Sequence, residues 1–380
     1  MSFDAARGTA LTSAPALLEQ WYRDHLCPDA LDVSSSGVPP ITMAELRALT
    51  GITGEALDAV RLEDSHSLGW PPLRQAVADA WAGGDAARVL IGQGSNEAVF
   101  LLLHTLLEPG DDVVAMSPIY HAYGSALRSA GCRVRHWAVR PEDGPNLDLD
   151  ELERLVLPRT RAVLVNLPHN PSGVTVSPAG QARIVEIAAA RGAYLVWDNA
   201  FAELVHDGEP LTDVAQLYER AFSVGTLSKC YGLPGLRIGW CVGPPAVLDR
   251  TVGLRDTTTL FCSTLTEFLA AHAVRNREKL SGHFTELVGK GRDIFLHWAR
   301  SSEVVESFTP PMGGVTSLVR FRGTTDATDL CVRLARAGVL LVPGRAFGAP
   351  AWARLGYAVP GDELGHGLEL VDRAVANAGR

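Results

Sequence analysis

Short apolar runs alternate with segments of helical periodicity through the first two thirds of the chain. Six runs rich in Val, Leu, Ile and Ala predict strands at 88–92, 112–116, 161–166, 193–198, 221–225 and 237–242. Between them, three segments repeat apolar positions every three to four residues, as the buried face of a helix does: 95–107, 122–130 and 177–191. The strands are apolar along most of their length, which is typical of a sheet covered on both faces. The alternation predicts a parallel, doubly wound α/β sheet.

The pattern changes near residue 255. A long helical stretch at 263–300 is followed by a Pro-Pro and Gly-Gly segment at 310–314. Further elements are predicted after it: a strand at 315–321, a helix at 328–337, a strand at 339–342 and a final helix from residue 362. These predict a smaller α+β domain. We expect a large domain at 46–260, with 1–45 and 261–380 together forming the small one.

Composition narrows the class of protein without indicating a reaction. The chain has 380 residues, of which 47% are hydrophobic and 20% charged, as in ordinary soluble globular proteins. Its net charge is −9 and no block of Lys and Arg stands out, so we expect neither a nucleic-acid nor a membrane partner. Residues 1–30 lack the basic and apolar regions of a signal peptide, and no apolar run would span a bilayer. A cytoplasmic enzyme is therefore expected.

Cysteine and histidine spacing gives no sign of a metal site. The six cysteines, Cys27 among them, contain no C-x-x-C pair, and the eleven histidines show no paired ligand spacing. Scattered cysteines in a long chain indicate free thiols in a reducing compartment.

The strongest chemical signal is a lysine just past the end of a predicted strand. Lys229 follows Thr226 and Ser228, and Arg237 stands eight residues later in a Gly-rich loop. Binding sites in open α/β sheets lie outside the carboxyl ends of the strands. A lysine lined by hydroxyls near an arginine can hold an aldehyde cofactor as a Schiff base, with the arginine on its phosphate. A solvated surface lysine is the alternative that this motif alone leaves open.

Four other strand ends carry side chains that suit the same cofactor. Asp198 ends a strand, where a carboxylate can keep a pyridine nitrogen protonated. Asn170 stands between two X-Pro steps that force extended or turn backbone, and its amide can donate to a phenolic oxygen. Ser95 can cap a helix whose N-terminus receives a phosphate. The Pro-Ile-Tyr-His-Ala-Tyr run at 118–123 offers an aromatic ring for stacking.

In this order, the motifs resemble the fold-type-I pyridoxal-5′-phosphate (PLP) enzymes of the aminotransferase class I/II group. The resemblance covers essentially the whole chain, through Gly-Ser-Asn-Glu-Ala, Pro-x-Tyr-x-x-Tyr, Asn-Pro-Ser-Gly, Asp-x-x-Phe, Ser-Lys-(x)7-Arg and a late Trp-Ala-Arg-Leu. It implies PLP as the cofactor and the PLP-dependent transferase fold type I. That fold has a mostly parallel central sheet with helices on both faces, plus a smaller α+β domain. The resemblance also implies a homodimer with shared active sites.

The resemblance assigns cofactor roles to the matching residues. Lys229 binds the cofactor and moves protons at Cα, and Asp198 pairs with the ring nitrogen. Asn170 contacts the phenolic oxygen, and Tyr123 stacks on the ring. Four residues hold the phosphate: Ser95, Asn96, Thr226 and Arg237.

Substrate roles and two departures from the family pattern follow from the same resemblance. Arg354 binds the α-carboxylate of an amino acid by a two-pronged pair, and Gly37 closes over it. Phe201 replaces the usual tyrosine three residues after the aspartate, so one donor to the phenolic oxygen is missing. Asp64 stands where a tyrosine usually reaches the partner's phosphate. A carboxylate there is unfavourable beside phosphate, so Asp64 is expected either to face a basic substrate side chain or to be a surface acid.

A narrower set of motifs is similar to the capreomycidine synthases. It comprises the segments at 32–38 and 64–69, the His-Asn-Pro-Ser-Gly run, Thr-Leu-Ser-Lys-x-Tyr-Gly-Leu-Pro-Gly-Leu-Arg at 226–237 and Val-Pro-Gly-Arg-x-Phe-Gly at 342–348. This resemblance implies cyclisation of 3-hydroxy-L-arginine in guanidino antibiotic biosynthesis of the viomycin or streptothricin type. The Cα proton and the 3-hydroxyl leave, and a guanidino nitrogen adds to Cβ. His121 or His169 is a candidate acid for the hydroxyl, with an ordinary loop contact as the favoured alternative for both.

Three other functions are weighed against this one. An aminotransferase acting on an arginine-like or aromatic amino acid shares the same lysine, aspartate and arginine. An aminotransferase-like transcription regulator is disfavoured, because fewer than about 35 residues precede the Ser-Ser-Ser-Gly run, too few for a helix-turn-helix domain. A nicotinamide dehydrogenase is disfavoured because no G-x-G-x-x-G follows a strand.

Overall fold

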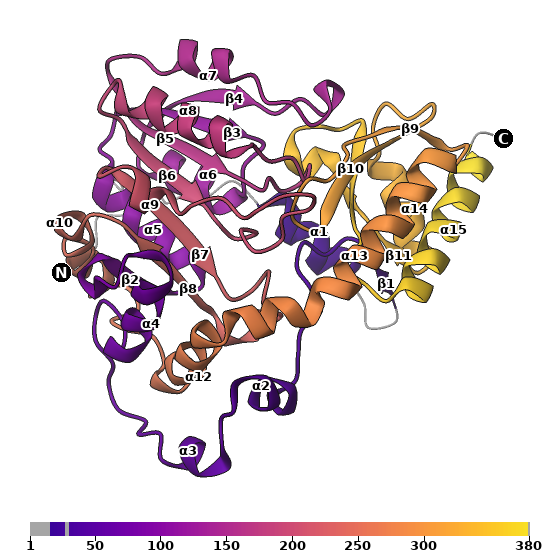
Figure 1. The fold of residues 1–380 in the computed structure, drawn as a ribbon. Helices are drawn as coiled ribbons and strands as arrows, with labels where there is room; N and C mark the ends of the chain where they lie inside the picture. The colour runs from indigo at the N-terminus through magenta and orange to yellow at the C-terminus, as the bar shows by residue number, and fades with distance from the viewer. Residues whose placement is uncertain (1–15, 27–29, 379–380) are drawn as a thin grey trace, which may run out of the picture.

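The computed structural model describes residues 16–26 and 30–378, which form a larger and a smaller lobe (Figure 1). A seven-stranded sheet with the order β2-β8-β7-β6-β5-β3-β4 runs through the larger lobe. Its strands are β2 (Val89–Gln93), β3 (Asp112–Ser117), β4 (Arg133–Ala138), β5 (Thr160–Asn166), β6 (Tyr194–Asp198), β7 (Ala221–Thr226) and β8 (Ile238–Val242). All pairs are parallel except those of β8, which is antiparallel to both neighbours. The predicted mostly parallel α/β sheet is confirmed.

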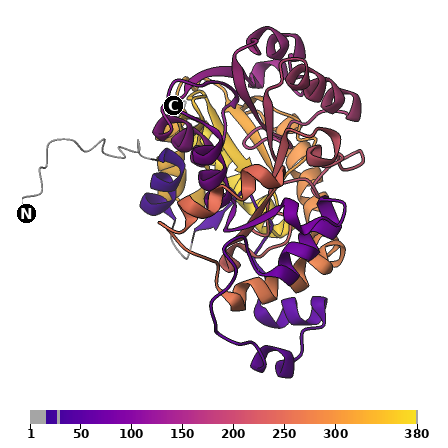
Figure 2. The ribbon, with the colours of Figure 1, turned by 90° about the vertical axis from the view of Figure 1, so that its left-hand side faces the viewer.

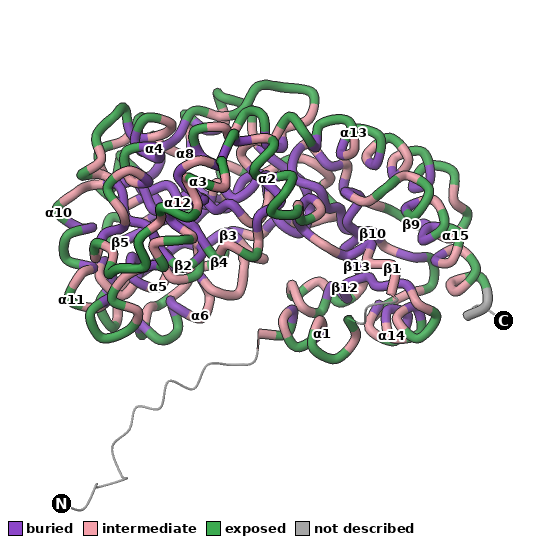
Figure 3. The backbone as a smooth tube through the Cα atoms, turned by 90° about the horizontal axis from the view of Figure 1, so that it is seen from below, coloured by how far each residue is buried: buried purple, intermediate pink, exposed green. Residues whose placement is uncertain are grey.

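Helices cover both faces of this sheet, and successive residues of one strand enter different cores. On β5, Leu164 packs in a cluster with the inner sides of α5 (Ser95–Leu106) and α6 (His121–Ser129). Its neighbour Val163 packs on the other face with α7 (Leu149–Leu155) and α8 (Pro178–Ala189). Both side chains are at most 1% exposed. Figure 3 shows such buried segments running through the middle of both lobes. This two-sided burial explains the continuous apolar runs of the strands.

The smaller lobe contains an antiparallel sheet with the order β12-β13-β10-β9. Its strands are β9 (Val305–Phe308), β10 (Thr316–Phe321), β12 (Val342–Pro343) and β13 (Trp352–Gly356). Three helices belong to this lobe: α13 (Arg277–Ser301), α14 (Thr328–Arg336) and α15 (Gly361–Ala378). Near the N-terminus, β1 (Leu31–Asp32) pairs in parallel with β11 (Val339–Leu340). An early segment therefore lies against the C-terminal part, while the exact domain boundaries at 46 and 260 stay a prediction.

The remaining helices connect these elements. They are α1 (Leu17–His25), α2 (Met43–Thr50), α3 (Gly54–Asp58), α4 (Pro71–Trp81), α9 (Val214–Leu217), α10 (Pro245–Leu248), α11 (Thr251–Arg255) and α12 (Thr264–Arg275), with 3-10 turns at Ala86–Arg88, Pro141–Asp143, Pro234–Leu236 and Gly344–Phe347. Figure 2, which has the larger lobe toward the viewer, shows α2 and α3 protruding below it, as they do in Figure 1. Within the described residues, no helix is long and apolar enough to cross a membrane.

The structure differs from the expected elements in several places, of which three matter here. β4 was not predicted, because this edge strand alternates basic and apolar residues and is only partly buried. The expected long helix at 263–300 is two helices, since α12 ends at Arg275 and α13 begins at Arg277. β13 was not predicted either, although it carries Arg354. The five described cysteines are free thiols, as predicted, and Cys27 lies outside the described residues.

Candidate active site

Five strands of the large sheet end at one edge, and the predicted site residues follow those ends. β2, β3, β5, β6 and β7 run in the same direction, because the antiparallel β8 separates β2 from β7. Their carboxyl ends lead into the segments that carry Ser95, Tyr123, Asn170 and Lys229, while Asp198 is the last residue of β6. The edge where open α/β sheets bind ligands therefore holds the whole predicted cofactor set.

The Ser-Ser-Ser-Gly segment packs closely against Lys229. Its Nζ donates a 3.0 Å hydrogen bond to Ser36 Oγ, and its carbonyl accepts one of 3.1 Å from the Val38 N–H. A Cβ at Gly37 would lie 3.2 Å from the Ser228 carbonyl oxygen and 3.5 Å from the Lys229 side chain. Glycine at this position thus allows the early segment to approach the lysine, which places Gly37 at the site as predicted.

Burial and a nearby positive charge lower the pKa of the Lys229 amine. Desolvation is the main cause that lowers its pKa to about 8, and the Arg354 charge lowers it further. The carboxylates of Glu19 and Asp198 act in the opposite direction. An amine with a pKa near 8 is partly neutral at physiological pH, and the neutral form is the nucleophile and base.

Asp198 is a buried carboxylate with a single protein donor among the described residues. It is 6% exposed, and its Oδ1 accepts a 2.9 Å hydrogen bond from the Ala200 N–H. Burial raises its pKa to about 6, against the smaller effects of the Ala200 N–H, the Tyr123 hydroxyl and the Lys229 charge. A buried carboxylate is stabilised by a cation or a protonated ring, so the site favours such a partner.

The N-terminus of α5 and Arg237 form an anion-binding cradle. Gly94 precedes the helix with φ +76°, and any Cβ there would overlap the Arg237 guanidinium. Glycine therefore allows the Arg237 guanidinium to lie against the backbone just before the N-terminus of α5. A helix N-terminus with an adjacent arginine is a ready anion site.

Two hydroxyls extend this cradle toward Lys229. Ser228 Oγ accepts hydrogen bonds from Thr226 Oγ1 at 3.0 Å and from Arg237 Nη1 at 3.3 Å. Thr226 is buried at the end of β7. Ser228 was not among the predicted phosphate residues, although the Thr-x-Ser-Lys spacing was available in the sequence.

Arg354 is fully buried on β13 and has no negatively charged partner among the described residues. It donates to Asn170 Oδ1 at 3.0 Å, to the Tyr22 hydroxyl at 2.8 Å and to the Ser34 carbonyl at 2.8 Å, all neutral acceptors. Its side chain is 0% exposed, and its Nε has no partner among the described residues. A buried charge of this kind needs an anion, and a bidentate carboxylate suits a guanidinium best.

The aromatic residues after β3 differ in their access to the site. Tyr123 is 1% exposed and its ring packs in the core under α5, with its hydroxyl beside Asp198. Its ring therefore has no free face for a cofactor. Tyr120, three residues earlier, is half-buried and lies near Asn96 and Arg237, both of which affect its pKa. The structure leaves Tyr120 better placed for stacking than the predicted Tyr123.

The remaining predicted residues lie in different surroundings. His121 begins α6, and its Nδ1 lies 3.9 Å from Glu19 Oε1. His169 is buried with both ring nitrogens bonded, to Ser172 Oγ at 2.7 Å and to the Pro118 carbonyl at 2.8 Å, which makes it a structural link between loops. Asp64 is exposed in the segment before α4 and forms no ion pair among the described residues, so its role stays a prediction. Phe201 is buried and offers no hydroxyl.

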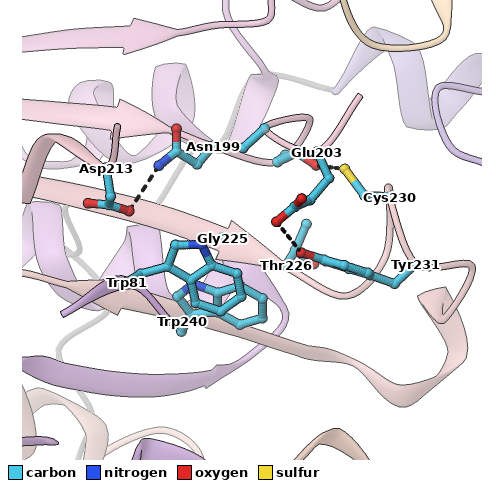
Figure 4. A pocket seen from close by; sticks show the side chains of 11 residues that line it. Trp81, Asn199, Glu203, Asp213, Gly225, Thr226, Cys230, Tyr231 and Trp240 are labelled. Carbon is cyan, nitrogen blue, oxygen red and sulfur yellow. Dashed lines mark hydrogen bonds between the residues drawn. The ribbon is translucent and has the colours of Figure 1, made fainter. Parts of the chain in front are cut away.

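A small polar pocket lies beside the lysine loop, lined in part by Thr226 and Cys230 (Figure 4). Trp81 and Trp240 stack at 4.8 Å at its base, which requires Gly225 because a Cβ there would overlap the Trp240 ring. Its polar groups bond to one another: Asn199 to Asp213 at 3.2 Å, Tyr231 to Glu203 at 3.2 Å, and Cys230 to the Ala200 carbonyl at 3.2 Å. We interpret this pocket as support for the Lys229 loop rather than as a substrate site.

Known proteins are similar to this chain over nearly its full length. Residues 62–371 match the profile of the aminotransferase class I and II family. Capreomycidine synthase from Streptomyces vinaceus is 44% identical over 375 residues, which cover 98% of this chain and 96% of that protein. Arginine–pyruvate transaminase from Pseudomonas aeruginosa is 28% identical over 327 residues, covering 82% and 83%. Among solved structures, the PLP-dependent cyclase OrfR has a TM-score of 0.92 at 45% identity, covering 98% of this chain and 100% of that chain.

Proposed function

The chain belongs to the aminotransferase class I and II family, and on this premise we propose that it is a PLP-dependent cyclase that converts 3-hydroxy-L-arginine to capreomycidine. The observation that carries the proposal is 44% identity to capreomycidine synthase over 98% of the chain. A TM-score of 0.92 to a PLP-dependent cyclase supports it. A product of this kind belongs to guanidino antibiotic biosynthesis, which we propose as the pathway.

The residues at the sheet edge fit PLP. The cradle around Gly94 suits a phosphate, and a Cβ at that position would fill it. The buried Asp198 forms no ion pair among the described residues, and a protonated ring nitrogen would supply that partner. We assign the phosphate to Ser95, Asn96, Thr226, Ser228 and Arg237.

Further cofactor contacts are proposed for the residues around the ring. We assign the covalent attachment to Lys229, the phenolic oxygen to Asn170 and the ring face to Tyr120. When bound, PLP supplies an electron sink for the electron pair left at the substrate Cα.

The substrate's backbone groups are held by residues from both lobes. Arg354 binds the α-carboxylate, which supplies the negative charge missing from its buried surroundings. Because Lys229 lies close enough for Arg354 to lower its pKa, a substrate held by Arg354 has its Cα near the Lys229 amine. Lys229 then removes the Cα proton and later returns one, which its pKa of about 8 allows at neutral pH.

The second half of the reaction takes place at Cβ. The C–O bond to the 3-hydroxyl breaks, the oxygen leaves with a proton as water, and a guanidino nitrogen forms a bond to Cβ as it loses a proton. His121 is the proposed proton donor to the hydroxyl, although burial lowers its pKa. The attack is intramolecular, so the site has mainly to hold a folded side chain and exclude water.

We propose that the working unit is a homodimer in which the active sites are shared. The segment before α4 carries Leu62, which is 82% exposed, beside the exposed Asp64. A dimer that covers this segment would bury the Leu62 side chain. Asp64 would then enter the partner's site. Light scattering on the purified protein tests the dimer, and a monomer at working concentration would contradict it.

An aminotransferase of an arginine-like amino acid is the second candidate, supported by similarity to arginine–pyruvate transaminase. The two functions differ in the fate of the amino group. A cyclase needs no keto acid and its product keeps the α-amino group, whereas an aminotransferase transfers that group to a keto acid. Incubation of the purified protein with 3-hydroxy-L-arginine, with and without pyruvate, separates them by mass spectrometry of the products.

A further inference from the structure

Helix α1 brings two polar side chains to the active site from the N-terminal part of the chain. Leu18 and Trp21 are buried and fix the helix on the protein. Tyr22 accepts a 2.8 Å hydrogen bond from Arg354 and donates one of 3.2 Å to the Ser34 carbonyl. Glu19 lies three residues before Tyr22, so both side chains share one face of the helix. The helix that contacts the carboxylate-binding arginine therefore also presents a carboxylate.

Glu19 lies beside His121, with its side chain 43% exposed at the rim of the site. Its Oε1 lies 3.9 Å from His121 Nδ1, which is too long for a hydrogen bond. That nitrogen is buried and has no other partner among the described residues. The Glu19 charge also acts on Lys229 and on Tyr120, and in each case it raises the pKa. Among the described residues, the Glu19 carboxylate forms no ion pair with a lysine or arginine, and its charge acts on both His121 and Lys229.

The proposed reaction needs a carboxylate in this place. A guanidino nitrogen must reach Cβ, so the substrate side chain has to fold back over Cα instead of extending away from it. Cα lies near Lys229, and the guanidinium must therefore be held near Lys229 as well. Among the described residues, Glu19 and Asp198 are the acids whose charges raise the pKa of Lys229 most. Asp198 is buried at the sheet edge and assigned to the cofactor ring, which leaves Glu19.

We infer that Glu19 receives the guanidinium of the substrate and holds it folded over Cβ, beside His121. This inference rests on the proposed function and names the residue that selects a basic side chain. It differs from the expectation for Asp64, which reaches a site only by way of a partner chain. A guanidinium paired with Glu19 also lies next to the histidine proposed to protonate the leaving hydroxyl.

The inference is tested by binding, with L-arginine and L-citrulline as probes. Citrulline has nearly the same shape as arginine but no charge, so the ratio of their dissociation constants reports the guanidinium contact. The constants are read from the change in the cofactor absorption band on titration. We expect the wild-type protein to bind arginine about 30-fold more tightly than citrulline, as for a hydrogen-bonded charge pair. Glu19→Gln should bring the ratio to within about threefold while citrulline affinity stays unchanged.

Three further variants make the result specific. Asp24→Asn removes an exposed acid from the same helix, where it accepts a hydrogen bond from Gln20, and should leave the ratio unchanged. Glu19→Asp keeps the charge and should retain part of the preference. Circular dichroism and full cofactor loading show that Glu19→Gln is folded. If this folded variant keeps the wild-type ratio, the inference is wrong, and loss of the ratio in Asp64→Asn instead assigns the contact to Asp64.

A failure of the proposed cyclase function would give a different experimental result from a failure of the role of Glu19. If the cyclase function fails, the wild-type protein does not remove water from 3-hydroxy-L-arginine, whatever its binding preference. A wild-type protein that performs this reaction, together with a Glu19→Gln variant that still prefers arginine, overturns only the role of Glu19.

Discussion

Arg354 donates a 3.0 Å hydrogen bond to Asn170, joining β13 of the smaller lobe to the loop after β5 of the larger one. The residue proposed for the α-carboxylate therefore contacts the residue proposed for the cofactor's phenolic oxygen. Both side chains are buried. This hydrogen bond fixes the proposed substrate-binding residue relative to the proposed cofactor-binding residue, although the two residues come from different lobes.

Replacing Arg354 should weaken substrate binding without preventing cofactor attachment. Arg354→Gln removes the charge that meets the α-carboxylate, and a lost charge-assisted pair of about 2–3 kcal/mol raises KM by about 30- to 150-fold. Arg345→Gln is the matched control, since Arg345 is an exposed arginine paired with Asp326 nearby in the chain. Steady-state kinetics measures the effect. An unchanged KM in Arg354→Gln would contradict the carboxylate role.

Cofactor attachment should depend on pH with a midpoint near 8. The neutral Lys229 amine forms the bond, and burial lowers its pKa to about 8 from the usual 10.5. The rate of attachment to cofactor-free protein should therefore rise with pH and level off above about 8. Arg354→Gln should move the midpoint upward, because the Arg354 charge favours the neutral amine. Stopped-flow absorbance measures the rate.

Lys229→Ala is the control for this pH dependence. After borohydride treatment, the wild-type protein should carry the cofactor on Lys229, and the variant should carry none. A borohydride-stable adduct elsewhere in the folded variant would mean that Lys229 is not the attachment site.

Cofactor-free protein should become more stable when Asp198 is replaced by Asn, and this gain in stability should grow as the pH rises from about 4 to above 6. Burial raises the pKa of Asp198 to about 6 from 3.8, so the folded state loses stability as the pH rises through this range. The difference of about two pKa units corresponds to about 3 kcal/mol at pH 8, and about half of that at pH 5. Urea denaturation of both proteins at the two pH values measures it. A gain in the free energy of unfolding that does not change with pH would contradict a buried, ionised carboxylate at Asp198.

Gly94→Ala should lower the affinity for PLP by displacing Arg237. The new Cβ would overlap the guanidinium, and overpacking of about 1–3 kcal/mol predicts a Kd for PLP raised about 5- to 150-fold. Gly110→Ala is the control, since Gly110 also has a positive φ, +91°, but has open space for a Cβ. Both variants lose backbone stability, and only Gly94→Ala should lose cofactor affinity. If fluorescence titrations gave the same Kd for PLP in Gly94→Ala and Gly110→Ala, the proposed phosphate site at Gly94 and Arg237 would be wrong.

The sheet and its binding edge follow from local patterns in the sequence. Buried parallel strands are apolar throughout and end in polar turns, so both their positions and the residues after them were predictable. β4 was not, because an edge strand with Arg133 and Arg135 lacks that signature. The reversed direction of β8 was also not visible, since an apolar run does not show which way its strand points.

Site residues that depend on contacts distant in sequence were harder to find. Tyr120 and Tyr123 lie in the same motif, and only the packing of α6 shows which ring is buried. Glu19 carries no motif, and its approach to His121 and Lys229 comes from the docking of α1 through Leu18 and Trp21. The candidate His169 could be judged only once both ring nitrogens were found to be bonded within the protein.

The most direct test is the product formed from 3-hydroxy-L-arginine by the purified, PLP-loaded protein when no keto acid is supplied. Mass spectrometry should show loss of one water, and NMR should show a closed ring that keeps its α-amino group. Recovery of unchanged substrate, or a keto acid formed only when pyruvate is added, would contradict the cyclase function and favour an aminotransferase.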